Sequence, residues 1–318
     1  MRRGLALLPL AAILATSAAL AAPERSATPR LAGCPVFPAT NAWNRRVDRL
    51  PVARNSATLI RTIGLGSPVH ADFGSGTWDG GPIGIPYTVV TSRQPGVGVT
   101  FDYADESDPG PYPIPRNARI EGGPHATGDR HLIVVDKTAC KLYELFDAHP
   151  LDAGHSWHAG SGATFDLRSN RLRPRTWTSA DAAGLPILPG LARYDEVAQG
   201  AIRHALRFTA PRTRTAFVWP ARHEAGSSAS ASLPPMGLRV RLKRGADISH
   251  LPRQARVVAQ AMRTYGLMLA DNGSPWYVSG APDPRWSNDD LHALGRLRGS
   301  DFEVVTVRPQ APAPGVTR

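Results

Sequence analysis

Cysteine is nearly absent from this sequence of 318 residues, which contains only Cys34 and Cys140. Neither belongs to a Cys-x-x-Cys pair or has a histidine partner nearby, so a zinc site or a catalytic thiol at these positions is disfavoured. In a chain outside the cytoplasm an even pair indicates a disulfide. The bond would close a loop of about a hundred residues and stabilise the fold by on the order of 4 kcal/mol in the chain-entropy model.

Several common functional motifs are also missing. No Gly-x-Ser-x-Gly elbow is present, which argues against an α/β-hydrolase, and there is no glycine-rich phosphate loop or dinucleotide fingerprint. Lysine occurs only at Lys137, Lys141 and Lys243, whereas arginine is abundant and the formal net charge is +11. Because no basic run is interleaved with aromatic residues, nucleic acid is not an expected partner. The basic surface is either a general property of the chain or attracts an anionic polymer.

Only one long apolar run is present, from Leu5 to Leu20. It follows two arginines and ends in a small-x-small pattern before Ala22, which predicts a signal peptide over residues 1–21 and a secreted, periplasmic or extracellular mature chain. No later run is long enough to span a membrane, so no transmembrane segment is expected in the mature chain. Two less favoured alternatives are retention of the run as an anchor and lipidation of Cys34, which ends the lipoprotein-like box 31–34.

Glycine and proline, 30 of each, divide the rest of the chain into short segments. Runs of β-branched and aromatic residues between turn residues predict strands. These strands are 87–90, 97–103, 131–136, 141–146, 214–219, 238–242, 276–279 and 302–307. An apolar stripe predicts a helix over 253–270 that ends at Asn272-Gly273. Shorter helices are expected at 56–63, 194–205 and 289–297.

These elements favour a mainly β fold, sandwich or barrel-like, with a few helices and with an α+β arrangement as the fallback. The chain has no internal repeat or long linker, and its length suits one extracellular β-rich domain over residues 22–308. Residues 309–318 are rich in proline and alanine and are expected to form a flexible C-terminal tail.

Four segments resemble a family of secreted bacterial proteins that has no established activity. They are Cys34-Pro-Val-Phe-Pro38, Phe101-Asp-Tyr-Ala-Asp-Glu-Ser-Asp-Pro-Gly-Pro-Tyr-Pro-Ile-Pro115, Thr178-Ser-Ala-Asp-Ala-Ala-Gly-Leu-Pro-Ile187 and Ala270-Asp-Asn-Gly-Ser-Pro-Trp-Tyr277. The resemblance extends from about Cys34 to Glu303, which is nearly the whole mature chain. It implies export and a single domain, and it implies no substrate, cofactor or site residue.

Two polar segments contain residues that could bind a metal. On an extended strand His70 and Asp72 point to one face, and His131 could complete a ligand set from another strand. The favoured alternative is a hydrogen-bonded pair that stabilises a loop. Four acids within 102–108 would suit calcium, although pairing with arginine is the favoured interpretation. Calcium or zinc is therefore the candidate cofactor.

A third group has the residue types of general acid–base catalysis on an acidic or polyhydroxylated substrate. The candidate catalytic residues are Asp181, Asp195, Glu196 and His204, and the candidate substrate clamp is Arg203 with Arg207. The alternatives are a simple N-cap at Asp181 and a charge-paired helix around His204. A fourth group mixes aromatic and polar residues: Trp219, Arg222, His223, Trp276 and Trp286. Such residues bind sugars, but tryptophan is equally common in the core of a β-sandwich.

These features predict a secreted carbohydrate-active enzyme, either a glycoside hydrolase or a lyase, that acts on an extracellular polysaccharide or a cell-envelope glycan. One alternative is a non-catalytic protein that binds glycans or the cell envelope. A second alternative is a metal-dependent hydrolase built around His70, Asp72 and His131.

Overall fold

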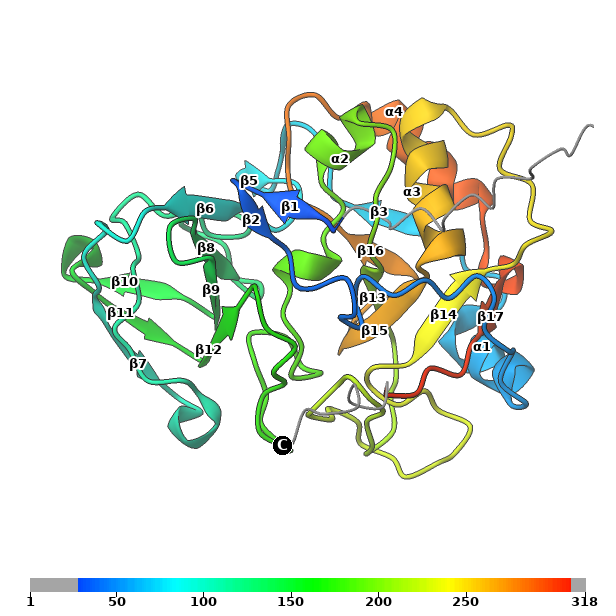
Figure 1. Cartoon of the computed structure of the whole chain (residues 1–318), viewed down its shortest axis with the longest axis horizontal. Coiled ribbons are helices and arrows are strands. Elements are labelled where there is room, and N and C mark those ends of the chain that lie inside the picture. The colour runs from blue at the N-terminus through cyan, green and yellow to red at the C-terminus, as the bar shows by residue number, and fades with distance from the viewer. Residues whose placement is uncertain (1–27, 310–318) are drawn as a thin grey trace, which may run out of the picture.

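Two groups of strands lie side by side along the long axis of the molecule, which the computed structural model describes from residue 28 to residue 309 (Figure 1). The strands of residues 87–166 form one group, and those of residues 70–72 and 206–304 form the other together with the helices. The predicted signal peptide at 1–21 and the predicted tail beyond residue 309 lie outside the described residues.

The first group contains two sheets. A four-stranded sheet has the order β12-β9-β8-β6, in which β8 pairs antiparallel with β9 and parallel with β6. Its strands are β6 (Tyr87–Val90), β8 (Leu132–Asp136), β9 (Lys141–Phe146) and β12 (Ser161–Asp166). A three-stranded sheet has the order β10-β11-β7. Its strands are β7 (Gly98–Phe101), β10 (His149–Leu151) and β11 (Ser156–Ala159).

Strand β8 is buried along its whole length because both of its faces pack against a core. Leu132 and Val134 point into a smaller cluster with Tyr112 and Trp157, between the two sheets. Ile133 and Val135 belong to the main cluster, which also contains residues of the second group of strands. This explains why β8 reads as a continuous apolar run rather than an alternating one. The shared core makes the two groups one domain.

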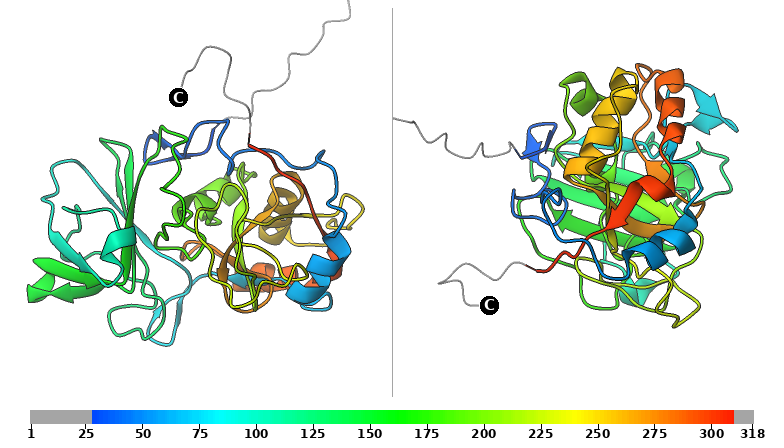
Figure 2. Two further views of the ribbon diagram at one scale, coloured as in Figure 1. Left: turned by 90° about the horizontal axis from the view of Figure 1, so that it is seen from below. Right: turned by 90° about the vertical axis from the view of Figure 1, so that its right-hand side faces the viewer.

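The second group is a mixed six-stranded sheet with the order β17-β14-β15-β13-β16-β3. Its strands are β3 (His70–Asp72), β13 (Leu206–Ala210), β14 (Arg239–Leu242), β15 (Leu267–Asn272), β16 (Tyr277–Ser279) and β17 (Phe302–Val304). The helices are α1 (Ser56–Gly64), α2 (Tyr194–Ala198), α3 (Arg253–Thr264) and α4 (Asn288–His292). In the right-hand view of Figure 2, α3 and α4 stand side by side at one side of the sheet and α1 lies at the other.

Short elements complete the fold. Two small hairpins pair β1 (Arg30–Leu31) with β2 (Cys34–Pro35) and β4 (Thr77–Trp78) with β5 (Gly81–Pro82). The 3-10 turns are η1 (Ala104–Glu106), η2 (Asp152–Gly154), η3 (Leu188–Gly190), η4 (Ala293–Arg296) and η5 (Gly299–Asp301). Cys34 and Cys140 form the predicted disulfide, with their Cα atoms 5.4 Å apart. Because its sulfur is bonded to Cys140, Cys34 is not free for the lipidation considered from the sequence.

The predicted fold class is confirmed: the domain is mainly β with few helices, and no sheet closes into a barrel within residues 28–309. The long helix expected over 253–270 is wrong in its second half. It ends at Thr264, and Leu267–Asn272 forms β15. Gly266 causes the change, because it adopts φ +77° and packs against the Val240 carbonyl oxygen of β14.

Two further expectations fail locally. The strand expected at 214–219 makes only isolated bridges, so this segment is irregular. The helix expected over 194–205 stops at Ala198, because the chain must extend again before it enters β13. Across residues 28–309 no helix has both the length and the apolar character needed to cross a membrane.

Candidate functional site

A cavity of about 640 Å³ lies between the edge strand β3, the β4–β5 hairpin, the loop 121–130 and helix α4. Four carboxylates line it, from Asp72, Asp79, Glu121 and Asp129. Clefts in which titratable groups gather and have perturbed pKa values are the usual location of catalytic sites. This acidic cavity is therefore the candidate functional site.

Asp72 and Glu121 line the same cavity, but the pKa of Asp72 is raised and the pKa of Glu121 is lowered. Burial by the surrounding protein raises the pKa of Asp72, although its side chain reaches solvent, and the nearby Glu121 carboxylate acts in the same direction. Burial would also raise the pKa of Glu121, but the charge and hydrogen bonds of His131 lower it below the usual value. The result is one carboxyl group that holds its proton more tightly beside another that is ionised.

His131 is positioned by β8 and carries a positive charge. Its Nδ1 lies 2.5 Å from Glu121 Oε2, and its Nε2 lies 3.0 Å from the carbonyl oxygen of Ala180. A carbonyl oxygen and an ionised carboxylate both accept, so both ring nitrogens must donate. Burial alone would lower the pKa of His131, but Glu121 raises it to about 9. The imidazolium therefore fixes Glu121 in its ionised form.

A buried arginine lies behind the cavity wall. Arg207 on β13 donates from Nε to Asp181 Oδ2 at 3.2 Å and from Nη1 to the hydroxyl of Ser279 at 2.7 Å, and its Nη2 lies 3.6 Å from Asp271 Oδ2. Ser279 on β16 is in register with Asp72 on the edge strand. Burial raises the pKa values of Asp181 and Asp271, so Arg207 must compensate two carboxyl groups that are poorly hydrated. The sheet thus links this ion cluster to Asp72.

An exposed tryptophan stands at the cavity on the β4–β5 hairpin. The turn residues Asp79 and Gly80 both have positive φ, +50° and +84°, as a two-residue hairpin turn of type I′ requires. Trp78 precedes this turn and is 79% exposed, the highest value among the large hydrophobic residues within 28–309. The hairpin rests on the loop below it, since a Cβ added at Gly81 would lie 2.0 Å from the Gly122 carbonyl. An aromatic face is therefore held in solvent beside the carboxylates.

The predicted metal site is not formed. His131 uses both ring nitrogens in hydrogen bonds to Glu121 and Ala180, and the His70 ring stacks on Tyr277 with centroids 4.2 Å apart. Asp72 lines the cavity near His70, but no group of three His, Cys, Asp or Glu side chains suited to a metal occurs in the part of the chain that the structure describes. The assignment of His70, Asp72 and His131 as a ligand set is therefore corrected, and only His70 and Asp72 share a face as expected.

The predicted catalytic residues fall into two separate networks. Asp181 is fully enclosed beside Arg207, so it can position the cavity wall but cannot touch a polymer. Glu196 accepts a hydrogen bond from His204 Nε2 at 2.9 Å, and its carboxylate lies 2.7 Å from Arg193 Nη2. Burial would raise the pKa of Glu196, but Arg193 and His204 lower it below the usual value. Asp195 lies on the same short helix with its side chain partly exposed. This second network joins α2 to the sheet.

Two predicted sugar-binding tryptophans are core residues instead. Trp276 is fully buried between Phe208 and Phe302, with centroid distances of 5.4 and 4.8 Å. Trp286 is buried against Phe73, and its indole N–H donates to the Ala281 carbonyl oxygen. Both indoles are inaccessible, so neither can stack on a sugar.

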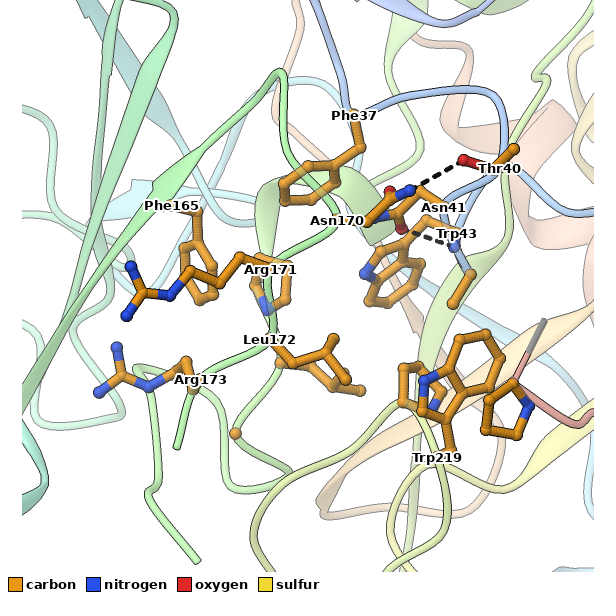
Figure 3. A pocket seen from close by; sticks show the side chains of 16 residues that line it. Phe37, Thr40, Asn41, Trp43, Phe165, Asn170, Arg171, Leu172, Arg173 and Trp219 are labelled. Atoms are coloured by element: carbon orange, nitrogen blue, oxygen red, sulfur yellow. Dashed lines mark hydrogen bonds between the residues drawn. The ribbon is translucent and has the colours of Figure 1, made fainter. Parts of the chain in front are cut away.

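The remaining predicted binding residues are dispersed. Trp219 lines a different cavity of about 620 Å³, which Figure 3 shows surrounded by apolar side chains such as Phe37, Trp43 and Leu172. Arg222 donates to the Arg173 carbonyl oxygen, His223 bonds the Ala182 carbonyl oxygen, and Arg203 lines a shallow hollow beside α3. These residues do not meet at one surface with the acidic cavity.

The acidic stretch 102–108 is held by arginine and backbone contacts, which agrees with the favoured interpretation. Arg173 forms an ion pair with Asp108, and the Thr178 amide donates to Glu106 Oε2. Asp102 lies 3.2 Å from His158 Nε2. These contacts fasten the stretch to neighbouring loops.

Comparison with known proteins adds no family to this description. No protein-family model, curated protein or solved structure matches the chain.

Of the residues that define the cavity best, the sequence indicated Asp129 only as a possible metal ligand beside His131, and it did not indicate Glu121 or Trp78 at all. Trp78 lies more than 40 positions before Glu121, and no short motif joins the two residues. One signal was available, because Asp79-Gly80 between two short extended runs is a strong hairpin indicator and would have placed Trp78 on an exposed turn. Nothing comparable marks Glu121, whose importance depends on its contact with His131.

Proposed function

We propose that this chain is an exported polysaccharide hydrolase that works by general acid–base catalysis in the acidic cavity. The observation that carries the proposal is that Asp72 and Glu121 line one cavity, where their surroundings shift their pKa values in opposite directions. Paired carboxyl groups whose environments separate their pKa values are the usual acid and base of glycoside hydrolysis. The disulfide and the N-terminal sequence support export.

In this mechanism Asp72 is the acid and Glu121 is the base. A water molecule attacks the anomeric carbon and gives its proton to Glu121, while the glycosidic C–O bond breaks and the leaving oxygen takes the proton of Asp72. Trp78 offers an aromatic face to the apolar side of a sugar ring. His131 keeps Glu121 ionised and oriented before each turnover.

The test is release of reducing ends from a panel of polysaccharides by the full mature chain. Asp72→Asn should lower kcat by about 10²- to 10⁴-fold, since a positioned general acid contributes this much. Glu121→Gln should lower kcat similarly, and it should also reduce stability because the ion pair with His131 is lost. Asp289→Asn is the matched control, because Asp289 is exposed on α4 and does not line the cavity.

A second candidate function is glycan binding without catalysis, which the exposure of Trp78 favours. It predicts retention of a polysaccharide that Trp78→Ala abolishes and Asp72→Asn leaves intact, with no product formed. Normal turnover by both Asp72→Asn and Glu121→Gln would rule out the proposed mechanism. A product with an ultraviolet-absorbing double bond would identify a lyase instead of a hydrolase.

A further inference from the structure

A second cavity lies beside the acidic one and differs from it in charge. It also has a volume of about 640 Å³, and both cavities are lined by Pro82 at the end of the β4–β5 hairpin. Gly74 and Gly123 line the second cavity, while their chain neighbours Phe73 and Gly122 line the first. The two cavities are therefore adjacent, with the hairpin and the loop at Gly122 between them.

The side chains of the second cavity give it a positive charge. Arg116 and Arg119 line it and are both exposed, and neither forms an ion pair with an acid among the residues that the structure describes. The nearest polar contact of Arg116 is with His155, at 3.5 Å. The acid in the lining is Asp283, which is already paired with Arg285 at 2.7 Å. The guanidinium groups of Arg116 and Arg119 thus have no acidic partner within residues 28–309, and the only acid of that range in the lining, Asp283, is already paired.

We infer that Arg116 and Arg119 form a subsite for the carboxylate of a uronic acid, and that the substrate is a polysaccharide in which a uronic acid neighbours an uncharged sugar. Guanidinium groups bind carboxylates through paired, charge-assisted hydrogen bonds. The carboxylates of Asp79, Glu121 and Asp129 in the first cavity disfavour a uronate there, so we expect an uncharged sugar at the point of cleavage. The inference rests on the proposed function for the cleaved bond, whereas the arginine subsite is testable by binding alone.

The test measures binding of Asp72→Asn, in the full mature chain, to three polymers by calorimetry. The probes are hyaluronan oligosaccharides, which alternate a neutral amino sugar with glucuronate, polygalacturonate, which is charged at every sugar, and dextran, which is uncharged. Hyaluronan should bind most tightly, and its affinity should fall as salt increases. Arg116→Ala with Arg119→Ala should weaken that binding by roughly tenfold or more and flatten its salt dependence.

Arg61→Ala is the matched control, because Arg61 is an exposed arginine on α1 and lines neither cavity. Unchanged affinity in the Arg116/Arg119 double variant, equal binding of dextran, or no binding of hyaluronan would overturn the inference. Turnover that does not depend on these arginines removes the subsite but leaves the hydrolase proposal in place. Arginine-dependent binding of hyaluronan by a parental chain that releases reducing ends from no polysaccharide of the panel supports the subsite and removes the hydrolase proposal.

Discussion

Arg207 compensates the buried carboxyl groups behind the candidate site. It is nearly fully buried and holds Asp181 and Ser279 directly, with Asp271 at 3.6 Å. Burying charges is costly, and such a cluster is stable only when each charge has a partner. Removing the arginine leaves two carboxyl groups in a poorly hydrated space. Its loss should therefore lower the free energy of unfolding far more than the loss of a surface arginine.

Arg207→Met should therefore lower the free energy of unfolding by about 3–5 kcal/mol at pH 8. The loss should be smaller at pH 5, because Asp181 and Asp271, whose pKa values burial raises, can bind protons when the cation is gone. Urea unfolding at both pH values measures this. Arg61→Met on the exposed face of α1 is the control and should change stability by less than about 0.5 kcal/mol. An equal loss at both pH values would contradict the assignment.

Individual residues were predictable from the sequence only in part. The disulfide followed from counting cysteines, whereas Asp181 and Arg207 were expected to be a catalytic acid and a substrate clamp. The two residues were grouped in one catalytic site and do meet, but as an enclosed ion pair: they lie 26 positions apart and are buried together only when β13 packs below the loop after Trp177. Contacts of this range depend on the tertiary fold and leave no local pattern.

At the scale of elements, the strands were easier to predict than the helix ends. Strand β9 matches its expected range, since Lys141–Phe146 has the required residues between turns. The helix α3 was expected to continue because apolar residues follow Tyr265 at helical spacing. Gly266 ends the helix through its left-handed conformation and its close approach to Val240. Val240 lies on another strand, β14, so the sequence around Gly266 does not indicate this contact.

A strained backbone conformation usually costs about 1–3 kcal/mol. Gly266→Ala should lower the free energy of unfolding by more than this amount. The added Cβ would also lie 2.3 Å from the Val240 carbonyl oxygen, so β14 and β15 would have to separate. Gly245→Ala is the matched control, because its Cβ would meet no atom within 4 Å. Chemical unfolding followed by circular dichroism compares the two. Equal stability of the two variants would show that the contact with Val240 does not hold the junction.

At the scale of the whole molecule, charged groups are concentrated where the two groups of strands meet. Glu144 on β9 accepts from the backbone amides of Ile187 and Leu188, and His131, just before β8, contacts Ala180. Burial raises the pKa of Glu144 to about 7. The interface between the sheets therefore contains groups that prefer to be protonated, which gives the stability of the entire domain a definite dependence on pH.

The domain should be most stable near pH 5 and should lose stability steadily up to pH 9. A carboxyl group with a raised pKa, such as Glu144, binds its proton more tightly when folded, so its contribution disappears as the pH rises from about 4.5 to 7. The pKa of His131 is raised from 6.5 to about 9, so its contribution is complete below pH 6.5 and is lost progressively as the pH rises from 6.5 to 9. Below about pH 4.5 the trend reverses, because Glu121 and Glu196 have lowered pKa values and lose their ion pairs on protonation.

Thermal unfolding at constant ionic strength from pH 4 to 9 measures this profile. Glu144→Gln should flatten its slope between pH 4.5 and 7 while leaving the decline above pH 7, and a Tm that rises from pH 5 to 8 would refute the assignment of these protons.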